Sequence, residues 1–461
     1  MSHAPSIGVP ELAGLCDYRQ AARIGPSVEE NVHRLLRLHW TEKRLMEIAL
    51  AHLPATPEWE VKCALALHQW QDAEHADALR RRITEMRNPA PRLDVPPDAA
   101  LEAFLDEVLR PHGTLELLAG IYRVARPALV RAYRRQLELS NPLVDHPTRR
   151  MIRINLVEQE EALAWGEAAV DALLADDAAR DRAAAWEAHL RRYLQAAGGI
   201  AGGEPVTADA GPLPPPRATS PFVPDTTPRR DGRFAGRHNF NFPPHVVYNA
   251  PGVPADERNL ALLCKRTLEM DVPEMMASFM TERRDQPWEF YRDYARQLWD
   301  EARHAMMGSV ALEARGVDWT RIPLNVGFSL RLNRHADPLE RQLLLYAIEQ
   351  SLMPGDTGKR FEYETARQAG DDLSAHFHDY DWADEVLHTQ IGRRWLKREG
   401  FGVADALERA RQVHERTWAA LDQYHALEPQ ADWWADFVRR VLGKESAADL
   451  EELGEVKVVA E

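Results

Sequence analysis

The chain has 461 residues, of which 45% are hydrophobic and 28% are charged, and its net charge is −15. This composition is typical of a globular protein with a sizeable core, and the acidic balance argues against nucleic acid or an anionic membrane as the main partner. The three cysteines are far apart and lack CxxC spacing, which argues against a disulfide framework, a zinc ribbon and an iron–sulfur cluster.

The N-terminal sequence lacks a charged segment followed by an apolar one, so we expect no signal peptide. No apolar run reaches the length of about 18 residues that a membrane span needs. These observations predict a cytoplasmic protein without a membrane partner.

Helical periodicity dominates most of the chain, and alternating β-branched runs are almost absent. The pattern therefore predicts an all-α protein. Pro and Gly are enriched over 196–245, which separates an N-terminal domain, 1–195, from a C-terminal domain, 246–461. The predicted helices are 29–53, 57–87, 99–140 and 145–175, then 256–281, 287–315, 338–369 and 372–400, and finally two near 403–425 and 430–443.

The two sets of four helices resemble each other in sequence. The segment around Glu42 is similar to that around Glu269, at an offset of 227 residues (269 − 42). Three residues of the next helix recur at an offset of 229: Trp59 and Trp288, Trp70 and Trp299, and His75 and His304. We interpret this as a duplication that gives two four-helix units in tandem.

The second unit carries two copies of a metal-binding pattern, DEARH at 300–304 and DEVLH at 384–388. A Glu and a His three residues apart project from one face of a helix. A further Glu precedes each copy by the length of one helix and a turn, so four helices direct carboxylates and imidazoles at one interior point. The predicted metal ligands are Glu269, Glu301, His304, Glu349, Glu385 and His388.

An aspartate precedes the Glu in both copies. Metal-bound histidines usually donate their second ring N–H to a carboxylate. We therefore predict that Asp300 and Asp384 accept these hydrogen bonds, each from the histidine of the opposite helix.

The first unit retains only part of this pattern. Aligned at the same offsets are Glu42, Asp72, His75, Tyr122, Glu158 and Glu161, with Gln71 and Val157 at the aspartate positions. Tyr122 replaces a carboxylate and Glu161 replaces a histidine. We expect a mainly structural unit, with weak binding of a single metal ion at Glu42, Asp72, His75, Glu158 and Glu161 as the alternative.

Carboxylate and imidazole ligands without thiolate suit iron or manganese better than structural zinc. We expect two iron ions per chain, with manganese or a mixed Fe/Mn pair as the alternative.

Residues 256–400 resemble the ferritin-like superfamily of non-haem diiron carboxylate proteins. DEARH is similar to the motif of bacterial diiron monooxygenases, and 369–396 is similar to the last bundle helix of an uncharacterised bacterial ferritin-like family related to diiron tRNA hydroxylases. The resemblance implies tandem ferritin-like four-helix bundles, of which the second holds the dimetal core site. It also implies dioxygen activation at a carboxylate-bridged iron pair.

These features predict a non-haem diiron oxygenase or oxidase that uses dioxygen to oxidise a small organic substrate. The chain shows no dinucleotide-binding fingerprint or Cys cluster, so a separate reductase or ferredoxin must supply electrons. A non-catalytic protein for iron storage and a structural metal protein remain the alternatives. A homodimer is left as an open alternative for the oligomeric state.

Helix-breaking residues follow two of the predicted ligands: Pro273 after Glu269, and Pro354 with Gly355 after Glu349. We hypothesise that they open a channel beside the metals, the alternative being ordinary kinks. Methionines near the ligands could line a pocket, although a role in the core is the simpler interpretation. Histidines without matching partners, including His378 and His414, are assigned to the surface or the core.

Overall fold

The computed structural model describes residues 8–87, 89–205 and 211–450. Throughout these ranges the regular structure is helical and no strand occurs, which confirms the all-α prediction. No helix within them is both long enough and apolar enough to cross a membrane.

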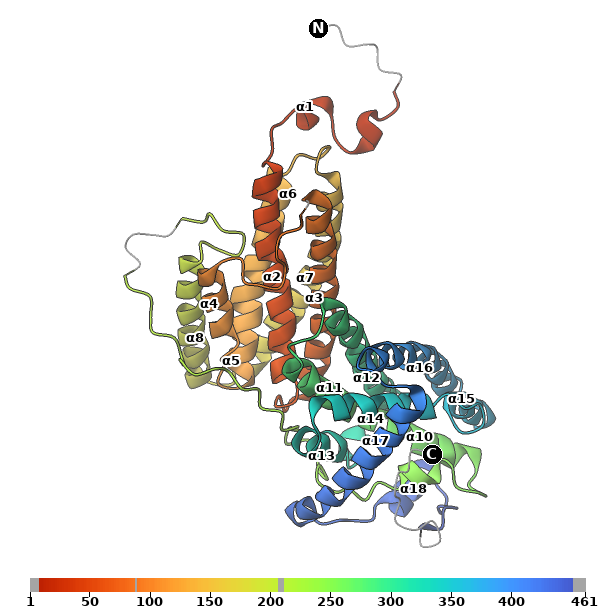
Figure 1. The fold of residues 1–461 in the computed structure, drawn as a ribbon. Helices are drawn as coiled ribbons and strands as arrows, with labels where there is room; N and C mark the ends of the chain where they lie inside the picture. The colour runs from red at the N-terminus through yellow and green to blue at the C-terminus, as the bar shows by residue number, and fades with distance from the viewer. Residues whose placement is uncertain (1–7, 88, 206–210, 451–461) are drawn as a thin grey trace. The chain divides into compact units, whose positions relative to one another are not determined.

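The chain forms two compact units (Figure 1). The first comprises Met1–Ile48 and Gln71–Val223, and the second comprises Ala49–Trp70 and Pro224–Glu461. The Pro- and Gly-rich segment 196–245 is therefore divided between the units. Residues 49–70 belong to the second unit, although their position in the sequence suggested the first.

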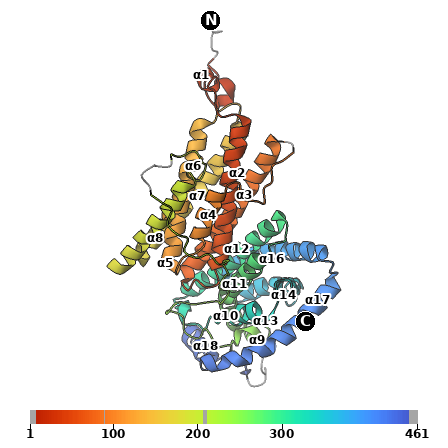
Figure 2. The same cartoon turned by 60° about the vertical axis from the view of Figure 1, so that its left-hand side comes forward.

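Four long helices of the first unit lie side by side (Figures 1 and 2). Side chains from all four meet in the interior, as described below. These helices are α2 (Val28–His52), α3 (Trp59–Met86), α6 (Arg126–Leu139) and α7 (His146–Leu173). The shorter helices are α1 (Tyr18–Ala21), α4 (Ala99–Val108), α5 (Thr114–Leu118) and α8 (Asp177–Ala196).

The single helix predicted over 99–140 is wrong, because the chain breaks after α4. Residues 109–113 contain Pro111 and end on Gly113, whose φ of +94° disfavours other residues. A π-helical segment, Ala119–Ala125, then joins α5 to α6. Helix α8, which packs on α4, was not predicted.

The second unit is built around four helical paths, each of which is either one helix or two consecutive helices. Two of the four are interrupted in this way. The first path is α10 (Ala255–Leu268) with α11 (Asp271–Glu282), and the third is α14 (Pro338–Ser351) with α15 (Lys359–Gln368). The second and fourth paths are α12 (Trp288–Glu313) and α16 (Asp372–Arg398). Helix α10 packs on α12, α14 packs on α16, and α12 packs on α16. All six ligands predicted in the second unit lie on these paths.

Both breaks directly follow a predicted ligand. Helix α10 ends at Leu268, so Glu269 is its C-terminal cap, and α14 ends two residues after Glu349. Pro273 is the third residue of α11. Proline is tolerated there, because the N–H groups of the first turn have no hydrogen-bond acceptor within the helix. The predicted kinks are therefore complete helix ends.

Two glycines let the helices of each pair approach closely. A β-carbon at Gly308 of α12 would lie 2.4 Å from Thr267 Oγ1 of α10. A β-carbon at Gly392 of α16 would lie 2.6 Å from Tyr346 Cδ2 of α14. Each glycine follows a predicted histidine ligand by four residues, so close packing occurs one turn from each histidine.

Further helices cover this four-path core. They are α9 (Pro244–Val247), α13 (Gly327–His335), α17 (Val403–Trp418), a 3-10 segment at Ala419–Leu427, and α18 (Trp434–Leu442). Helix α13, which was not predicted, packs on α11 and α17, and α14 also packs on α17.

Candidate metal centre

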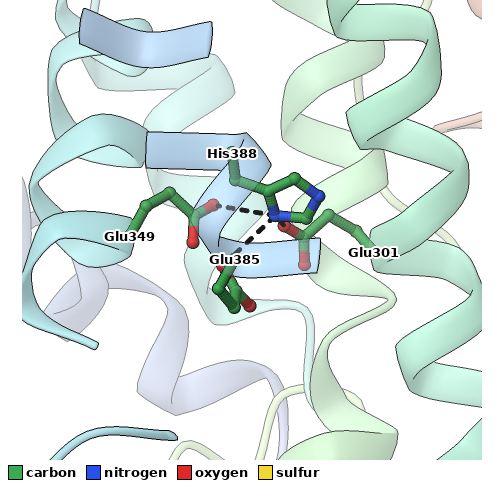
Figure 3. A group of neighbouring side chains, drawn as sticks. All are labelled: Glu301, Glu349, Glu385 and His388. Carbon is green, nitrogen blue, oxygen red and sulfur yellow. Dashed lines mark hydrogen bonds and ion pairs between the residues drawn. The ribbon is translucent and has the colours of Figure 1, made fainter. Parts of the chain in front are cut away.

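Four of the predicted ligands meet in the interior of the second unit: Glu301, Glu349, Glu385 and His388 (Figure 3). Their ligating atoms lie within 4.8 Å of one another. His388 Nδ1 is 3.2 Å from Glu301 Oε1, 3.2 Å from Glu385 Oε2 and 3.9 Å from Glu349 Oε1. One Nδ1 therefore faces carboxylates from three helices.

A second group adjoins the first and contains Glu269, His304 and Asp381. His304 Nδ1 is 3.7 Å from Glu269 Oε2 and 3.1 Å from Asp381 Oδ1. It also lies 3.8 Å from Glu301 and 3.9 Å from Glu385, which belong to the first group. The two imidazole rings are 5.9 Å apart between centroids. Glu301 and Glu385 thus lie between the two histidines, where bridging carboxylates are expected.

The two histidines contact the aspartates in a crossed pattern. His304 Nε2 on α12 is 3.1 Å from Asp384 Oδ2 on α16, and His388 Nε2 on α16 is 3.4 Å from Asp300 Oδ2 on α12. These are the contacts that the two DExxH motifs predicted. Because Nε2 of each ring contacts an aspartate, Nδ1 of each ring faces the carboxylates. This is the orientation required of a metal ligand.

Two arginines join the two aspartates, and the sequence analysis did not identify them. Arg303 Nη2 donates to Asp300 at 2.5 Å and to Asp384 at 2.7 Å, and Arg296 Nε donates to Asp300 at 2.8 Å. Although burial opposes ionisation of Asp300, hydrogen bonds from His388, Arg296 and Arg303 hold its pKa well below the usual range. Asp300 therefore remains a charged partner for His388.

The carboxylates of the centre are buried close to one another, and this perturbs their ionisation. Burial, followed by the charges of Glu385 and Glu301, raises the pKa of Glu349 well above its usual range. Gln297, another residue missed in the sequence, donates to Glu349 at 2.9 Å. Like charges in a dry interior repel strongly, so this cluster is a favourable environment for a multivalent cation.

Two basic side chains lie against the second group. Lys359 Nζ is 2.9 Å from Asp381 Oδ2, 3.0 Å from Glu385 Oε1 and 3.9 Å from Glu269 Oε1. Arg266 Nη1 is 2.6 Å from Asp381 and 3.1 Å from Glu269. A cation held by Glu269 and His304 must therefore compete with an ammonium and a guanidinium for the same oxygens.

Asp381 was also missed, although the sequence contains a signal for it. It precedes Glu385 by four residues and His388 by seven, which places all three on one face of α16. Arg266 also carried a signal, because it precedes Glu269 by three residues and pairs with it at i, i+3 spacing. Lys359 gave no such signal, because only the packing of α15 brings it to this face. His378, which the sequence left without a partner, is 3.0 Å from Arg266 Nη2 through Nδ1.

The donor set can be tested for its fit to metal ions. His304 Nδ1 and Glu301 Oε1 are fully buried and make no well-directed hydrogen bond among the described residues, although carboxylate or imidazole atoms lie within 4 Å of each. Such orphaned atoms are costly unless a ligand engages them. The atoms available are carboxylate oxygens and imidazole nitrogens, a set that suits iron or manganese. The residues therefore fit one ion at the first group directly and a second ion at the adjoining group.

A cavity of about 310 Å³ reaches the carboxylates. Glu269, Glu301, Glu349 and Glu385 form part of its wall, and Leu268, Ser351 and Leu352 at the helix breaks form another part. The cavity hypothesised beside the breaks is therefore present. The methionines near the ligands do not line it, and Met270, Met275, Met276 and Met280 are buried in the core instead.

The interior of the first unit contains a hydrogen-bonded network in the corresponding place. Arg126 makes a bidentate pair with Asp72, at 2.9 and 2.8 Å, and donates to Gln159 at 2.6 Å. Gln159 Nε2 donates to Glu42 at 2.8 Å, and the Tyr133 hydroxyl donates to the same carboxylate. Glu42, Asp72 and His75 are thus close enough to hold a cation, but Arg126 already supplies the positive charge.

The alignment of the last helix of the first unit was wrong by one residue. Glu161 is exposed and lies outside the network, whereas Gln159, Ala162 and Gly166 are buried. These three correspond to Glu385, His388 and Gly392 at an offset of 226 (385 − 159, 388 − 162 and 392 − 166). A single face of the helix carries the buried residues, so burial decides the register.

The corrected register changes the role of Glu158, which now corresponds to Asp384. His75 Nε2 is 2.7 Å from Glu158, as His304 Nε2 is 3.1 Å from Asp384. One orienting carboxylate has therefore been kept in the first unit, contrary to the expectation that both were lost. Arg126 contacts Asp72 and Gln159 in the interior. Arg126, rather than Tyr122, therefore occupies the place that corresponds to Glu349.

No family model, curated protein or solved structure shows significant similarity to this chain.

Proposed function

We propose that the second unit is a ferritin-like dimetal centre that binds two iron ions and uses dioxygen to oxidise a small organic substrate. The observation that carries this proposal is the cavity, because four of the carboxylates form part of its wall. A purely structural metal site is normally closed by protein ligands, whereas a catalytic one keeps access for a substrate.

Each part of the centre has a defined task under this proposal. Glu349 and His388 would hold one ion and Glu269 and His304 the other, and Glu301 and Glu385 would be available to both. Asp300 and Asp384 orient the imidazoles, and Arg303 holds both aspartates in place. An iron pair bound here supplies electrons for the activation of dioxygen.

The reaction class fixes the remaining requirements. Insertion of one oxygen atom from dioxygen into a C–H bond consumes two further electrons and two protons and releases one water molecule. A separate reductase or ferredoxin supplies the electrons. The apolar walls of the cavity exclude bulk water from the reacting groups.

The first experiment measures metal content in the full-length protein after anaerobic reconstitution with ferrous iron. We expect about two iron ions per chain in the wild type and loss of both in the double variant Glu301→Ala/Glu385→Ala. The matched control is Glu313→Ala/Asp379→Ala, which removes two exposed carboxylates from the same helices and should retain both ions.

Stoichiometric zinc, or no bound metal in the reconstituted wild type, would contradict the dimetal proposal. Iron loading far above two ions per chain would favour storage. With two ions bound, oxygen consumption that depends on an added organic substrate and reductant then tests the oxidase activity.

A further inference from the structure

The cavity of the second unit contains a buried arginine that no step of the proposed chemistry uses. Arg331 lies on α13 and forms part of the cavity wall. Only 3% of its surface is exposed. Helix α13 packs on α11 and α17, whereas the metal ligands come from α10, α12, α14 and α16. Arg331 and the carboxylates therefore belong to different walls.

The guanidinium of Arg331 has no hydrogen bond or ion pair among the described residues. Two of its nitrogens, Nε and Nη1, are fully enclosed without a partner. Its neighbours are aromatic: the guanidinium carbon is 4.9 Å from the ring centroid of Trp418 and 5.8 Å from that of Phe328. An unpaired buried charge costs several kcal/mol, so a protein rarely retains one without a function.

The acidic group that most influences Arg331 has other partners. Asp271 accepts hydrogen bonds from the backbone N–H of Phe328, at 2.8 Å, and from the Ser329 hydroxyl. Asp271 acts on Arg331 through the charge of its carboxylate, but it forms no hydrogen bond or ion pair with the guanidinium. Burial lowers the pKa of Arg331, to about 10, and it stays protonated.

The other groups on this wall do not supply a negative charge. His414 lines the cavity, and burial together with the charge of Arg331 lowers its pKa to about 4, so it is neutral. Lys265, which lines the cavity from α10, is paired with Glu362 at 2.7 Å. Arg331 is therefore a cation of the cavity wall that no described carboxylate contacts through a hydrogen bond or an ion pair.

The size and walls of the cavity define what can provide that counter-charge. A volume of about 310 Å³ is at the lower end of the range for small-molecule sites. Aromatic and aliphatic side chains form most of the remaining wall, including Phe240, Phe242, Leu344, Leu345, Ile348 and Leu421. The complementary ligand is a small molecule with an apolar body and one anionic group.

We propose that Arg331 binds the carboxylate of the substrate, and that the substrate is a small organic acid with an apolar or aromatic body. The carboxylate lies against α13 and the apolar body extends toward the wall formed by the metal ligands. This inference rests on the proposed function for the identity of the ligand as a substrate, but the binding itself requires no turnover.

The test compares acids with their uncharged amides in the full-length protein, both metal-free and iron-loaded. The probes are 3-phenylpropanoate and octanoate, each beside its primary amide, and binding is followed by tryptophan fluorescence because Trp418 lies over Arg331. We expect the wild type to prefer each acid by roughly 10- to 100-fold, the range for a hydrogen-bonded charge. Arg331→Met should abolish the preference.

The matched control is Arg334→Met, which removes the same charge from an exposed position on the same helix and should keep the preference. The melting temperature of the ligand-free protein adds a second readout. We expect Arg331→Met to melt at the same temperature as the wild type or higher, because the variant loses an unpaired buried charge. A merely structural arginine would give a lower melting temperature.

Three results would overturn the proposal: equal affinity for acid and amide in the wild type, no saturable binding of either acid, or an acid preference that survives in Arg331→Met. The last result would mean that the metal ions bind the carboxylate. Failure of the proposed function is distinguishable, because it appears as missing iron while the metal-free protein still selects the acids.

Discussion

At the scale of single residues, the centre differs from a simple set of six ligands because Lys359 and Arg266 share its oxygens. Burial and the charge of Arg266 lower the pKa of Lys359, but Asp381, Glu385 and Glu362 outweigh them and hold it well above the usual range. Lys359 is therefore a permanent cation beside the second group. The two ions should consequently bind with unequal affinity, the weaker one beside Glu269 and His304.

Replacement of Lys359 by Met should strengthen binding of the weaker ion. Removing a unit charge about 3–4 Å from the shared carboxylates is worth on the order of 1–4 kcal/mol, or about fivefold or more in affinity. Anaerobic calorimetric titration with ferrous iron would measure both binding steps. Lys265→Met is the matched control, because it removes an equal charge that pairs with Glu362 and contacts no ligand. Unchanged affinity in Lys359→Met would show that the ammonium does not compete.

At the scale of elements, each ExxH helix of the second unit carries a longer motif than the sequence analysis recognised. The pattern is DExxHxxxG, with Gly308 and Gly392 one turn after the histidines. At each of these glycines two helices approach so closely that a β-carbon would clash, one turn from the imidazole. In the first unit Gly166 keeps this place, where a β-carbon would lie 2.0 Å from Tyr122. The first unit therefore has the same close helix packing, although several of the corresponding ligand positions hold other residues.

The network of the first unit should make stability depend on pH. Burial lowers the pKa of His75, but Glu42, Glu158 and Asp72 outweigh it and raise the pKa to about 9. A folded pKa above the unfolded value of about 6.5 stabilises the protein fully below pH 6.5, and this contribution disappears as pH rises through 9. We expect a loss of about 2–3 kcal/mol in the free energy of unfolding over that window.

Urea unfolding at pH 6.0, 7.5 and 9.0 would measure this loss, and the variant His75→Gln should lack it. The difference between the two proteins isolates His75 from other titrating groups, Asp72 included. Parallel pH profiles for wild type and variant would contradict the assignment.

At the scale of the whole molecule, the two units interleave in sequence. Residues 49–70 connect α2 to α3, yet they belong to the second unit. Lys62 explains part of this assignment, because its side chain is fully buried, forms an ion pair with Glu274 and donates to the carbonyls of Leu53 and Pro54 at 3.0 and 2.8 Å. Arg230 contacts the same carboxylate at 2.5 Å.

Loss of Lys62 should therefore destabilise the second unit. In Lys62→Met the carboxylate of Glu274 loses one of two buried cations, and breaking such a pair costs about 3–5 kcal/mol. Lys43→Met is the control: its partner Glu47 is four residues away on the same, partly exposed helix face, and the cost should stay below about 1 kcal/mol. Thermal unfolding of both variants measures the difference. Equal melting temperatures of the two variants would mean that the buried contacts of Lys62 are not required for the stability of the second unit.

The sequence by itself determined the helical class and most helix ends, because helix periodicity is a local property. The i, i+3 spacing also predicted six metal ligands, and their side chains lie close together in the structure. The sequence also predicted the crossed contacts of Asp300 and Asp384, since two identical motifs on facing helices allow few alternatives. It failed where packing decides. The register of the last helix of the first unit depends on which face is buried, and a shift of one residue had exchanged Glu158 with the true interior residue Gln159.

Only the tertiary structure showed which basic side chains are buried beside the metal centre and the cavity. Arg331 lies on a helix that the pattern did not predict, and Lys359 lies beyond the break after α14. Arg266 precedes Glu269 by three residues, but only helix packing brings it to Asp381. All three side chains are buried beside carboxylates or aromatic rings. The assignment of residues 49–70 to the second unit has the same origin. Buried charges are paired through space rather than along the chain, so their partners follow from the packing of helices and not from local spacing.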